Sequence, residues 1–215
     1  MRGQFFPLSD SVERKNFPYV AIALILVNVI IFIWSLTSPI ASIEVNGEKS
    51  DIPLYILKYG FIPAQFSLIT IFTSMFLHGG LDHLFGNMWY LWIFGDNVED
   101  HWGKIKYIII YFLSGIAATF LQWLTDPKSV IPSIGASGAI SGVLGSYFIL
   151  YPKAGVETYY GEIPAYIVIG FWFVLQLIFG AVSLVGASGS EIAFWAHVGG
   201  FIFGVAVTWI FKKLS

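Results

Sequence analysis

Six long apolar runs occupy most of this chain of 215 residues. A helix of about 20 mostly apolar residues crosses the hydrocarbon core of a bilayer, and repeated runs of this length are typical of membrane proteins. Charged residues make up only 11% of the chain, whereas soluble domains carry about 25%. The sequence predicts an all-α polytopic membrane protein with one domain over residues 1–215 and spans near 18–38, 83–95, 105–125, 134–151, 163–185 and 191–211.

The positively charged residues indicate how these spans are oriented. With six spans and a cytoplasmic N-terminus, eight of the 11 Lys and Arg residues lie inside and three outside. Counting residues 66–77 as a seventh span reverses this division, although cytoplasmic loops normally carry the positive charge. We therefore expect both termini in the cytoplasm, a short tail over residues 1–17, and a long, partly helical outer loop over residues 39–81. Brevity and the lack of an added soluble domain favour a prokaryotic plasma membrane.

Four polar side chains fall at one depth in the outer part of this bundle. Spans two, four and six all begin at the outer face. His83 begins span two, and Asn87 lies one turn, about 6 Å, deeper. Ser137 lies within a turn of the start of span four, and His197 lies about 9 Å below the start of span six. Polar groups at this depth usually face a partner or a wet cavity, because an unpaired polar group in lipid is costly.

Glycines at four-residue spacing predict that spans four and six pack closely. Small residues at this spacing let two helix backbones approach each other. We therefore expect Ser137 and His197 at hydrogen-bonding distance, and a separation above about 5 Å would contradict this contact. The glycines that carry the prediction are Gly138 and Gly142 on span four, and Gly200 and Gly204 on span six.

These residue types favour hydrolysis by a serine nucleophile. A serine hydroxyl is a weak nucleophile until a neighbouring base takes its proton, and a neutral histidine is the usual base. The resulting oxyanion needs hydrogen-bond donors, and the Asn87 amide, the His83 ring and the Ser137 backbone N–H lie at a suitable depth. No carboxylate falls in this layer, so we expect a Ser-His dyad and not a triad.

Other interpretations compete with this one. A second Gly-Ala-Ser-Gly copy contains Ser188, which we expect to cap the following helix instead of acting as a nucleophile. A metal site of His78, His83 and His197 is disfavoured because no intramembrane carboxylate accompanies it and His-x4-His is an unusual zinc spacing. A small transporter or channel is another alternative, but it predicts polar residues across the whole bilayer. We expect no cofactor and no metal.

Composition also limits the partners. The absence of cysteine excludes disulfides, thiolate metal sites and a cysteine nucleophile. The net charge of −2 and the lack of a basic run give no indication of a nucleic-acid partner. The lipid bilayer and other membrane proteins are the expected partners, and the oligomeric state is left open.

Three segments, taken together, resemble the rhomboid intramembrane serine proteases. They are residues 78–87 (HGGLDHLFGN), 135–138 (GASG) and 196–200 (AHVGG), and the resemblance covers residues 66–208 in order and spacing. It implies cleavage of other membrane proteins near the outer ends of their transmembrane helices. A catalytically silent rhomboid-like binder is the other reading. The implied roles are Ser137 as nucleophile, His197 as general base, and His83 and Asn87 on the oxyanion side, with Gly135 in the motif of the nucleophile.

Two positions depart from the family pattern. Many rhomboids carry Trp-Arg in the first outer loop, where residues 67–72 read SLITIF. Four residues after the nucleophile the family often has an aromatic that packs on the catalytic histidine, and here this residue is Ser141. Another group must therefore hold the His197 ring. Both catalytic groups are retained, which favours an active enzyme. The loop over residues 183–190 is a candidate for movement.

Overall fold

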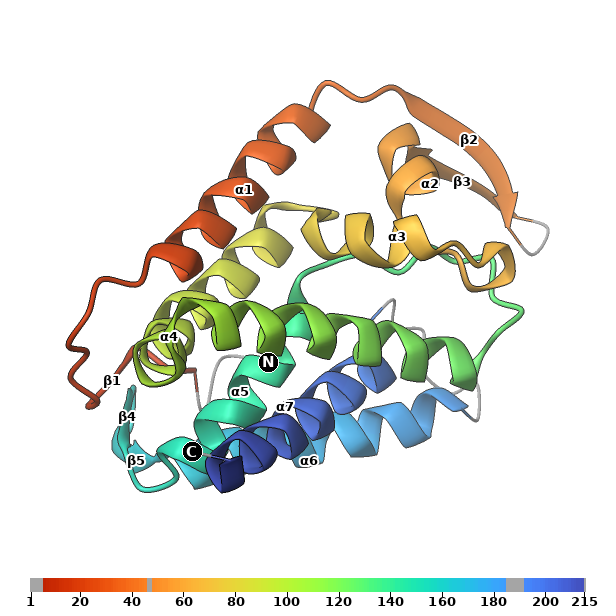
Figure 1. The fold of residues 1–215 in the computed structure, drawn as a ribbon. Helices are drawn as coiled ribbons and strands as arrows, with labels where there is room; N and C mark the ends of the chain where they lie inside the picture. The colour runs from red at the N-terminus through yellow and green to blue at the C-terminus, as the bar shows by residue number, and fades with distance from the viewer. Residues whose placement is uncertain (1–5, 46–47, 185–191, 215) are drawn as a thin grey trace.

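The computed structural model describes residues 6–45, 48–184 and 192–214. Within these ranges the chain is mostly helical, and its long helices lie side by side in a bundle (Figure 1). The bounds of the long helices are α1 (Tyr19–Ser35), α4 (Leu81–Thr125), α5 (Ser137–Leu150), α6 (Ala165–Leu184) and α7 (Phe194–Leu214).

The long helices have the composition of membrane spans. By length and hydropathy, α4, α6 and α7 are long enough to cross a membrane, while α1 and α5 are apolar but shorter. Helix α4 contains a break at Gly103, whose φ of 73° is in the region that favours glycine. Large apolar side chains are exposed along α1 and α6, for example Ile30 and Phe171. Because soluble monomers rarely expose such surfaces, the chain is an integral membrane protein.

The segment between α1 and α4 contains strands as well as short helices. A hairpin of β2 (Ile40–Val45) and β3 (Glu48–Pro53) lies at one end of the molecule (Figure 1). This hairpin corrects the expectation of a purely α-helical chain. The Tyr55 hydroxyl donates to the His78 carbonyl oxygen at 2.7 Å and so ties the segment to the start of α4. The remaining elements are α2 (Leu54–Tyr59), η1 (Pro63–Gln65), α3 (Leu68–Thr73) and η2 (Ser74–Phe76).

A second small sheet lies away from the hairpin, beside the C-terminal end of α5 (Figure 1). It pairs β1 (Ser9–Asp10) with β4 (Gly155–Thr158), and β4 with β5 (Gly161–Pro164), all antiparallel. The Asp10 carboxylate accepts hydrogen bonds from the Tyr147 hydroxyl at 2.5 Å and from the Asn97 amide at 2.8 Å. Burial raises the pKa of Asp10, although these two hydrogen bonds act in the opposite direction.

The segment before α1, expected to be a short tail, is hydrogen-bonded to the first part of α4. The Glu99 carboxylate accepts from the backbone N–H groups of Val20 and Ala21, at 3.0 and 2.8 Å, and so satisfies donors in the first turn of α1. The Asp100 carboxylate accepts from the backbone N–H groups of Lys15 and Asn16 at 2.7 and 2.9 Å. These acidic residues of α4 therefore hold the chain that leads into α1.

Helix α5 lies at the centre of the bundle, and every residue from Gly138 to Tyr147 is buried. Its contact with α7 is close enough to require glycine. A Cβ built at Gly200 would lie 3.0 Å from the Gly138 carbonyl carbon, and one built at Gly204 would lie 2.6 Å from the Gly142 Cα. The glycines that the sequence assigns to helix packing therefore lie where α5 and α7 touch.

Candidate active site

Ser137 is the first residue of α5, directly after a loop that only glycine permits. The Gly135 φ is 121°, which disfavours any residue with a side chain, and its N–H donates to the Ser74 carbonyl oxygen at 2.9 Å. A Cβ at Gly135 would lie 2.7 Å from the His83 Nε2. The loop therefore brings the start of α5 against the start of α4.

His197 reaches Ser137 from the first turns of α7. Its Nε2 lies 2.8 Å from the Ser137 Oγ, well inside the 5 Å limit set from the sequence. The N-terminal turn of α7 is fixed by the Gln122 side chain, whose Oε1 accepts from the Ala196 N–H at 3.2 Å. Both side chains are half-buried, so the pair lies at the edge of the packed core and not deep inside it.

The second nitrogen of the His197 ring has a partner that sequence reasoning missed. The His197 Nδ1 lies 2.8 Å from the Oε1 of Gln176 on α6, and the Trp172 ring lies beside the imidazole with 6.0 Å between centroids. The Ser141 hydroxyl donates to the Ser137 carbonyl oxygen at 2.6 Å. Helix α6 thus supplies groups that hold the histidine ring, and the signal for them was an amide within an apolar span.

His83 and Asn87 lie on the neighbouring face of α4. The half-buried His83 ring is the side chain nearest to the place where a Cβ at Gly135 would lie. The Asn87 amide donates to the His83 carbonyl oxygen at 3.0 Å. The ring of His78, which is fully buried in the preceding loop, meets the His83 ring edge-on at 5.0 Å. Burial, reinforced by His83, lowers the pKa of His78 to about 3, so this side chain is neutral at ordinary pH.

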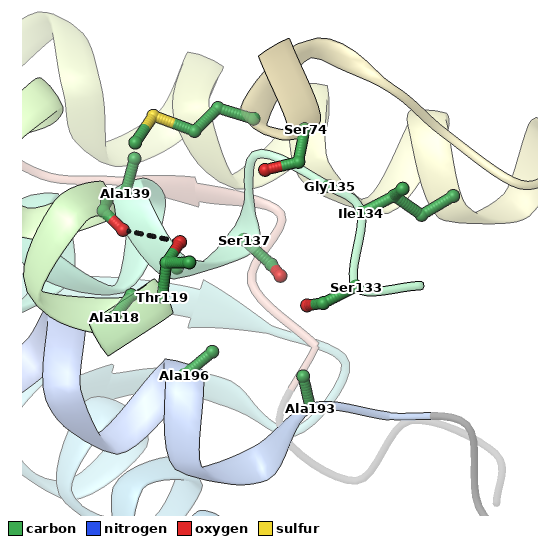
Figure 2. A pocket seen from close by; sticks show the side chains of 13 residues that line it. Ser74, Ala118, Thr119, Ser133, Ile134, Gly135, Ser137, Ala139, Ala193 and Ala196 are labelled. Carbon is green, nitrogen blue, oxygen red and sulfur yellow. Dashed lines mark hydrogen bonds between the residues drawn. The ribbon is translucent and has the colours of Figure 1, made fainter. Parts of the chain in front are cut away.

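A cavity opens beside the serine hydroxyl and is lined mainly by small side chains (Figure 2). The cavity has about 30 Å³ of space for water-sized groups, and about 340 Å³ when the open space at its mouth is counted. The side chains of Ala118 and Thr119 approach it from α4, Ala139 from α5, and Ala193 and Ala196 from α7 and the residues before it. A space with such walls admits a small group next to the Ser137 Oγ.

Other candidates from the sequence lie elsewhere. Ser188, expected to cap a helix, and most of the loop 183–190 fall outside the described residues. Within the described part of the chain, no three His, Cys, Asp or Glu side chains gather to hold a metal ion.

The fold and the site define a helical integral membrane protein in which a serine and a histidine meet at the start of the central helix. The family model of the Rhomboid domain matches residues 65–214. The chain therefore belongs to the rhomboid family.

Three curated relatives are each 32% identical to the chain where they align. They are Rhomboid protein 1, mitochondrial, of Saccharomyces cerevisiae, the Rhomboid protease GluP of Bacillus subtilis, and Inactive RHOMBOID-like protein 8 of Arabidopsis thaliana. The alignments cover 74%, 75% and 61% of this chain, and 47%, 30% and 35% of the relatives. The chain thus spans less than half the length of these relatives, one of which is called a protease and one inactive.

Proposed function

We propose that this chain is an intramembrane serine endopeptidase in which Ser137 is the nucleophile and His197 the general base. The observation that carries the proposal is the 2.8 Å distance between the Ser137 Oγ and the His197 Nε2, beside an open cavity. A base at this distance can take the hydroxyl proton as the oxygen attacks a carbonyl carbon. Membership of a family that includes a protease supports the same reaction class.

The proposed reaction has two stages. In the first, Ser137 attacks the peptide carbonyl carbon while its proton moves to the His197 Nε2, and this proton then passes to the leaving amine. The product is an acyl ester on the Ser137 Oγ. In the second stage a water molecule attacks the ester carbonyl while His197 takes its proton. This proton then passes to the departing Ser137 Oγ as the carboxylic product leaves.

Donors for the oxyanion lie at the N-terminus of α5. The first hydrogen bond of this helix joins the Ile140 N–H to the Ala136 carbonyl oxygen at 2.9 Å. The backbone N–H of Ser137 consequently has no partner within the helix and is free to bind developing negative charge. We assign His83 to the same side because its ring adjoins Gly135, and we place Asn87 behind it as a supporting group.

The cavity favours a small side chain next to the cleaved bond. Small side chains form most of its walls, among them Ala118 of α4, Ala139 of α5 and Ala196 of α7, so a bulky residue would have to displace packed helices. The proposed substrates are membrane proteins with a small residue at the cleavage position. Reporter substrates with Ala and Leu at this position, otherwise identical, test the preference.

The proposal includes six spans with both termini in the cytoplasm. They are α1, the two parts of α4 on either side of Gly103, α5, α6 and α7. Eight of the 11 basic residues then lie inside, and the dyad lies near the outer face. We retain the prokaryotic plasma membrane as the proposed host. The Bacillus subtilis relative is compatible with it, and the mitochondrial relative makes an organelle the alternative.

A catalytically silent membrane-protein binder is the second candidate, since one relative is named as inactive. Labelling by a fluorophosphonate distinguishes the two, because only an activated serine reacts. We expect labelling of the wild-type protein and none in Ser137→Ala or His197→Ala. We also expect both variants to leave a co-reconstituted single-span substrate intact.

The second Gly-Ala-Ser-Gly copy provides a matched control. Ser188→Ala makes the same chemical change in the same motif, and we expect it to label and cleave as the wild type does. Continued cleavage by Ser137→Ala would overturn the proposal.

A further inference from the structure

Gln176 is the single amide in α6, a helix of otherwise mainly apolar residues. Its side chain is only 8% exposed and its Oε1 lies 2.8 Å from the His197 Nδ1. A buried amide in a membrane span is costly unless its polar atoms are paired, and such residues are usually functional. The contact is therefore a specific feature of this site that apolar packing does not explain.

The other end of the amide settles which atom faces the histidine. The Gln176 Nε2 lies 3.4 Å from the Trp172 carbonyl oxygen, one turn earlier in α6. The reversed amide would place two oxygens against each other at this point. The Oε1 therefore accepts a hydrogen bond from the His197 ring, and an amide oxygen can accept only if Nδ1 carries the proton.

The proton position at one ring nitrogen determines what the other can do. A neutral imidazole has one donor and one acceptor nitrogen. With the proton on Nδ1, the Nε2 lone pair points at the Ser137 hydroxyl and can accept its proton. The other tautomer would present an N–H to the Ser137 Oγ and could not act as a base.

We propose that Gln176 is a positioning residue that holds His197 in the tautomer with its proton on Nδ1. This inference rests on the proposed protease function of the dyad. Gln176 takes the place that an acid occupies in a Ser-His-Asp triad, but as a neutral acceptor. The adjacent Trp172 ring limits the remaining rotation of the imidazole, so α6 fixes both the tautomer and the ring plane.

The test compares two substitutions of similar length. Gln176→Met removes the acceptor and keeps an unbranched apolar side chain, whereas Gln176→Glu keeps an acceptor oxygen. The control is Thr208→Val, which removes a buried hydrogen bond of 2.7 Å between the Thr208 and Ser146 hydroxyls, away from the dyad. The measurements are kcat and KM for a single-span reporter in proteoliposomes, over a range of pH, together with thermal unfolding.

We expect Gln176→Met to lower kcat by about 100-fold with KM within twofold, since a histidine in the wrong tautomer costs a serine protease up to about 10⁴-fold. Gln176→Glu should recover most of kcat and move the acidic limb of the pH profile to higher pH, because a carboxylate favours the protonated imidazole. Thr208→Val should leave kcat within about threefold. A kcat for Gln176→Met within twofold of the wild type overturns the proposal, as does equal loss in Gln176→Glu and Gln176→Met.

A second readout does not depend on activity. In protein with ¹⁵N-labelled histidine and Ser137→Ala, the NMR shifts of the His197 nitrogens report which one carries the proton. We expect the proton on Nδ1, and a mixture of tautomers after Gln176→Met. A proton on Nε2 with Gln176 present would overturn the proposal. A different result would overturn the proposed protease function: a wild-type protein that neither labels with a fluorophosphonate nor cleaves a reporter.

Discussion

Gly200→Ala should separate the dyad without unfolding the protein. The added methyl carbon would lie 3.0 Å from the Gly138 carbonyl carbon and 3.3 Å from the Ser141 Cβ. The methyl carbon would also overlap the Gly138 carbonyl oxygen, a backbone atom, and non-bonded heavy atoms pack at about 3.5–4.0 Å, so α5 and α7 must separate by more than about 1 Å. Gly138 follows Ser137 and Gly200 lies one turn after His197, so the movement acts directly on the contact between Ser137 and His197. The 2.8 Å hydrogen bond would lengthen to about 4 Å, beyond its useful limit.

The expected size of the effect follows from this displacement. A misplacement of about 1 Å in an active site can reduce the rate by about 10²-fold. We therefore expect kcat to fall by at least about 100-fold. Overpacking costs about 1–3 kcal/mol, and the better helix propensity of alanine returns up to about 1 kcal/mol. Because the overlapped atom belongs to the backbone, the net loss lies at the upper end of this range, about 2 kcal/mol. A loss of this size leaves the protein folded, so kcat falls by more than the loss of stability explains.

The assay is cleavage of a single-span reporter in proteoliposomes at saturating substrate, with thermal unfolding followed by the fluorescence of the eight tryptophans. Gly170→Ala is the matched control, because a Cβ there meets only Phe148, at an ordinary 3.9 Å. We expect this control to keep wild-type kcat. If Gly200→Ala retains kcat within twofold while remaining folded, the argument that the α5–α7 contact sets the dyad distance is wrong.

Three further predictions concern the loop before α5, the wall of the cavity and the small sheet beside the C-terminal end of α5. Gly135→Ala should reduce fluorophosphonate labelling at least tenfold and lower the unfolding midpoint, because its φ of 121° costs about 1–3 kcal/mol and its Cβ would meet His83. Ala193→Leu should slow cleavage of a reporter with Ala at the cleavage position by about tenfold in kcat/KM, with labelling by a small fluorophosphonate kept. Asp10→Asn should flatten the pH dependence of unfolding. The raised pKa of Asp10 means that the folded state binds more protons than the unfolded state, so wild-type stability should fall as pH rises from about 4 to the folded pKa, and an unchanged profile would contradict this.

The proximity of Ser137 and His197 could be predicted because helix geometry converts sequence position into depth. A fixed rise per residue places Ser137 and His197 in one layer once the ends of the spans are known. Small residues at four-residue spacing then select which helices approach closely. Both arguments use only the rise of a helix per residue and the spacing of residues along it. The 2.8 Å contact between these side chains is consistent with them.

Gln176 was missed because its partner is set by the rotation of α6, which the sequence does not determine. The helix is apolar on nearly every side, so periodicity gives no preferred face to turn inward. A lone amide in such a helix was the available signal, because polar groups in spans are rarely without a partner.

The two small sheets were missed for different reasons. The two-residue strand Ser9–Asp10 pairs with Gly155–Thr158, and such a short strand has no alternation to detect. The hairpin of Ile40–Val45 and Glu48–Pro53 had a signal, since Asn46-Gly47 is the dipeptide most typical of a hairpin turn. The prediction of a long, partly helical outer loop over residues 39–81 did not use that dipeptide.

A neutral amide suits this position better than the carboxylate of a soluble triad. A carboxylate beside His197 would stay charged at rest, and the removal of an ion from water costs several kcal/mol even when it is paired. With His197 in the proposed tautomer, Ser137, His197 and Gln176 instead form a chain of hydrogen bonds in which each group donates to the next, and the Gln176 amide ends it at the Trp172 carbonyl oxygen. These hydrogen-bonded side chains carry no net charge in the resting protein. In the proposed reaction, the imidazolium and the oxyanion form only when the serine attacks. Gln176→Glu should consequently unfold at lower temperature than the wild type even where its kcat is retained, because the added charge is present in the resting protein as well.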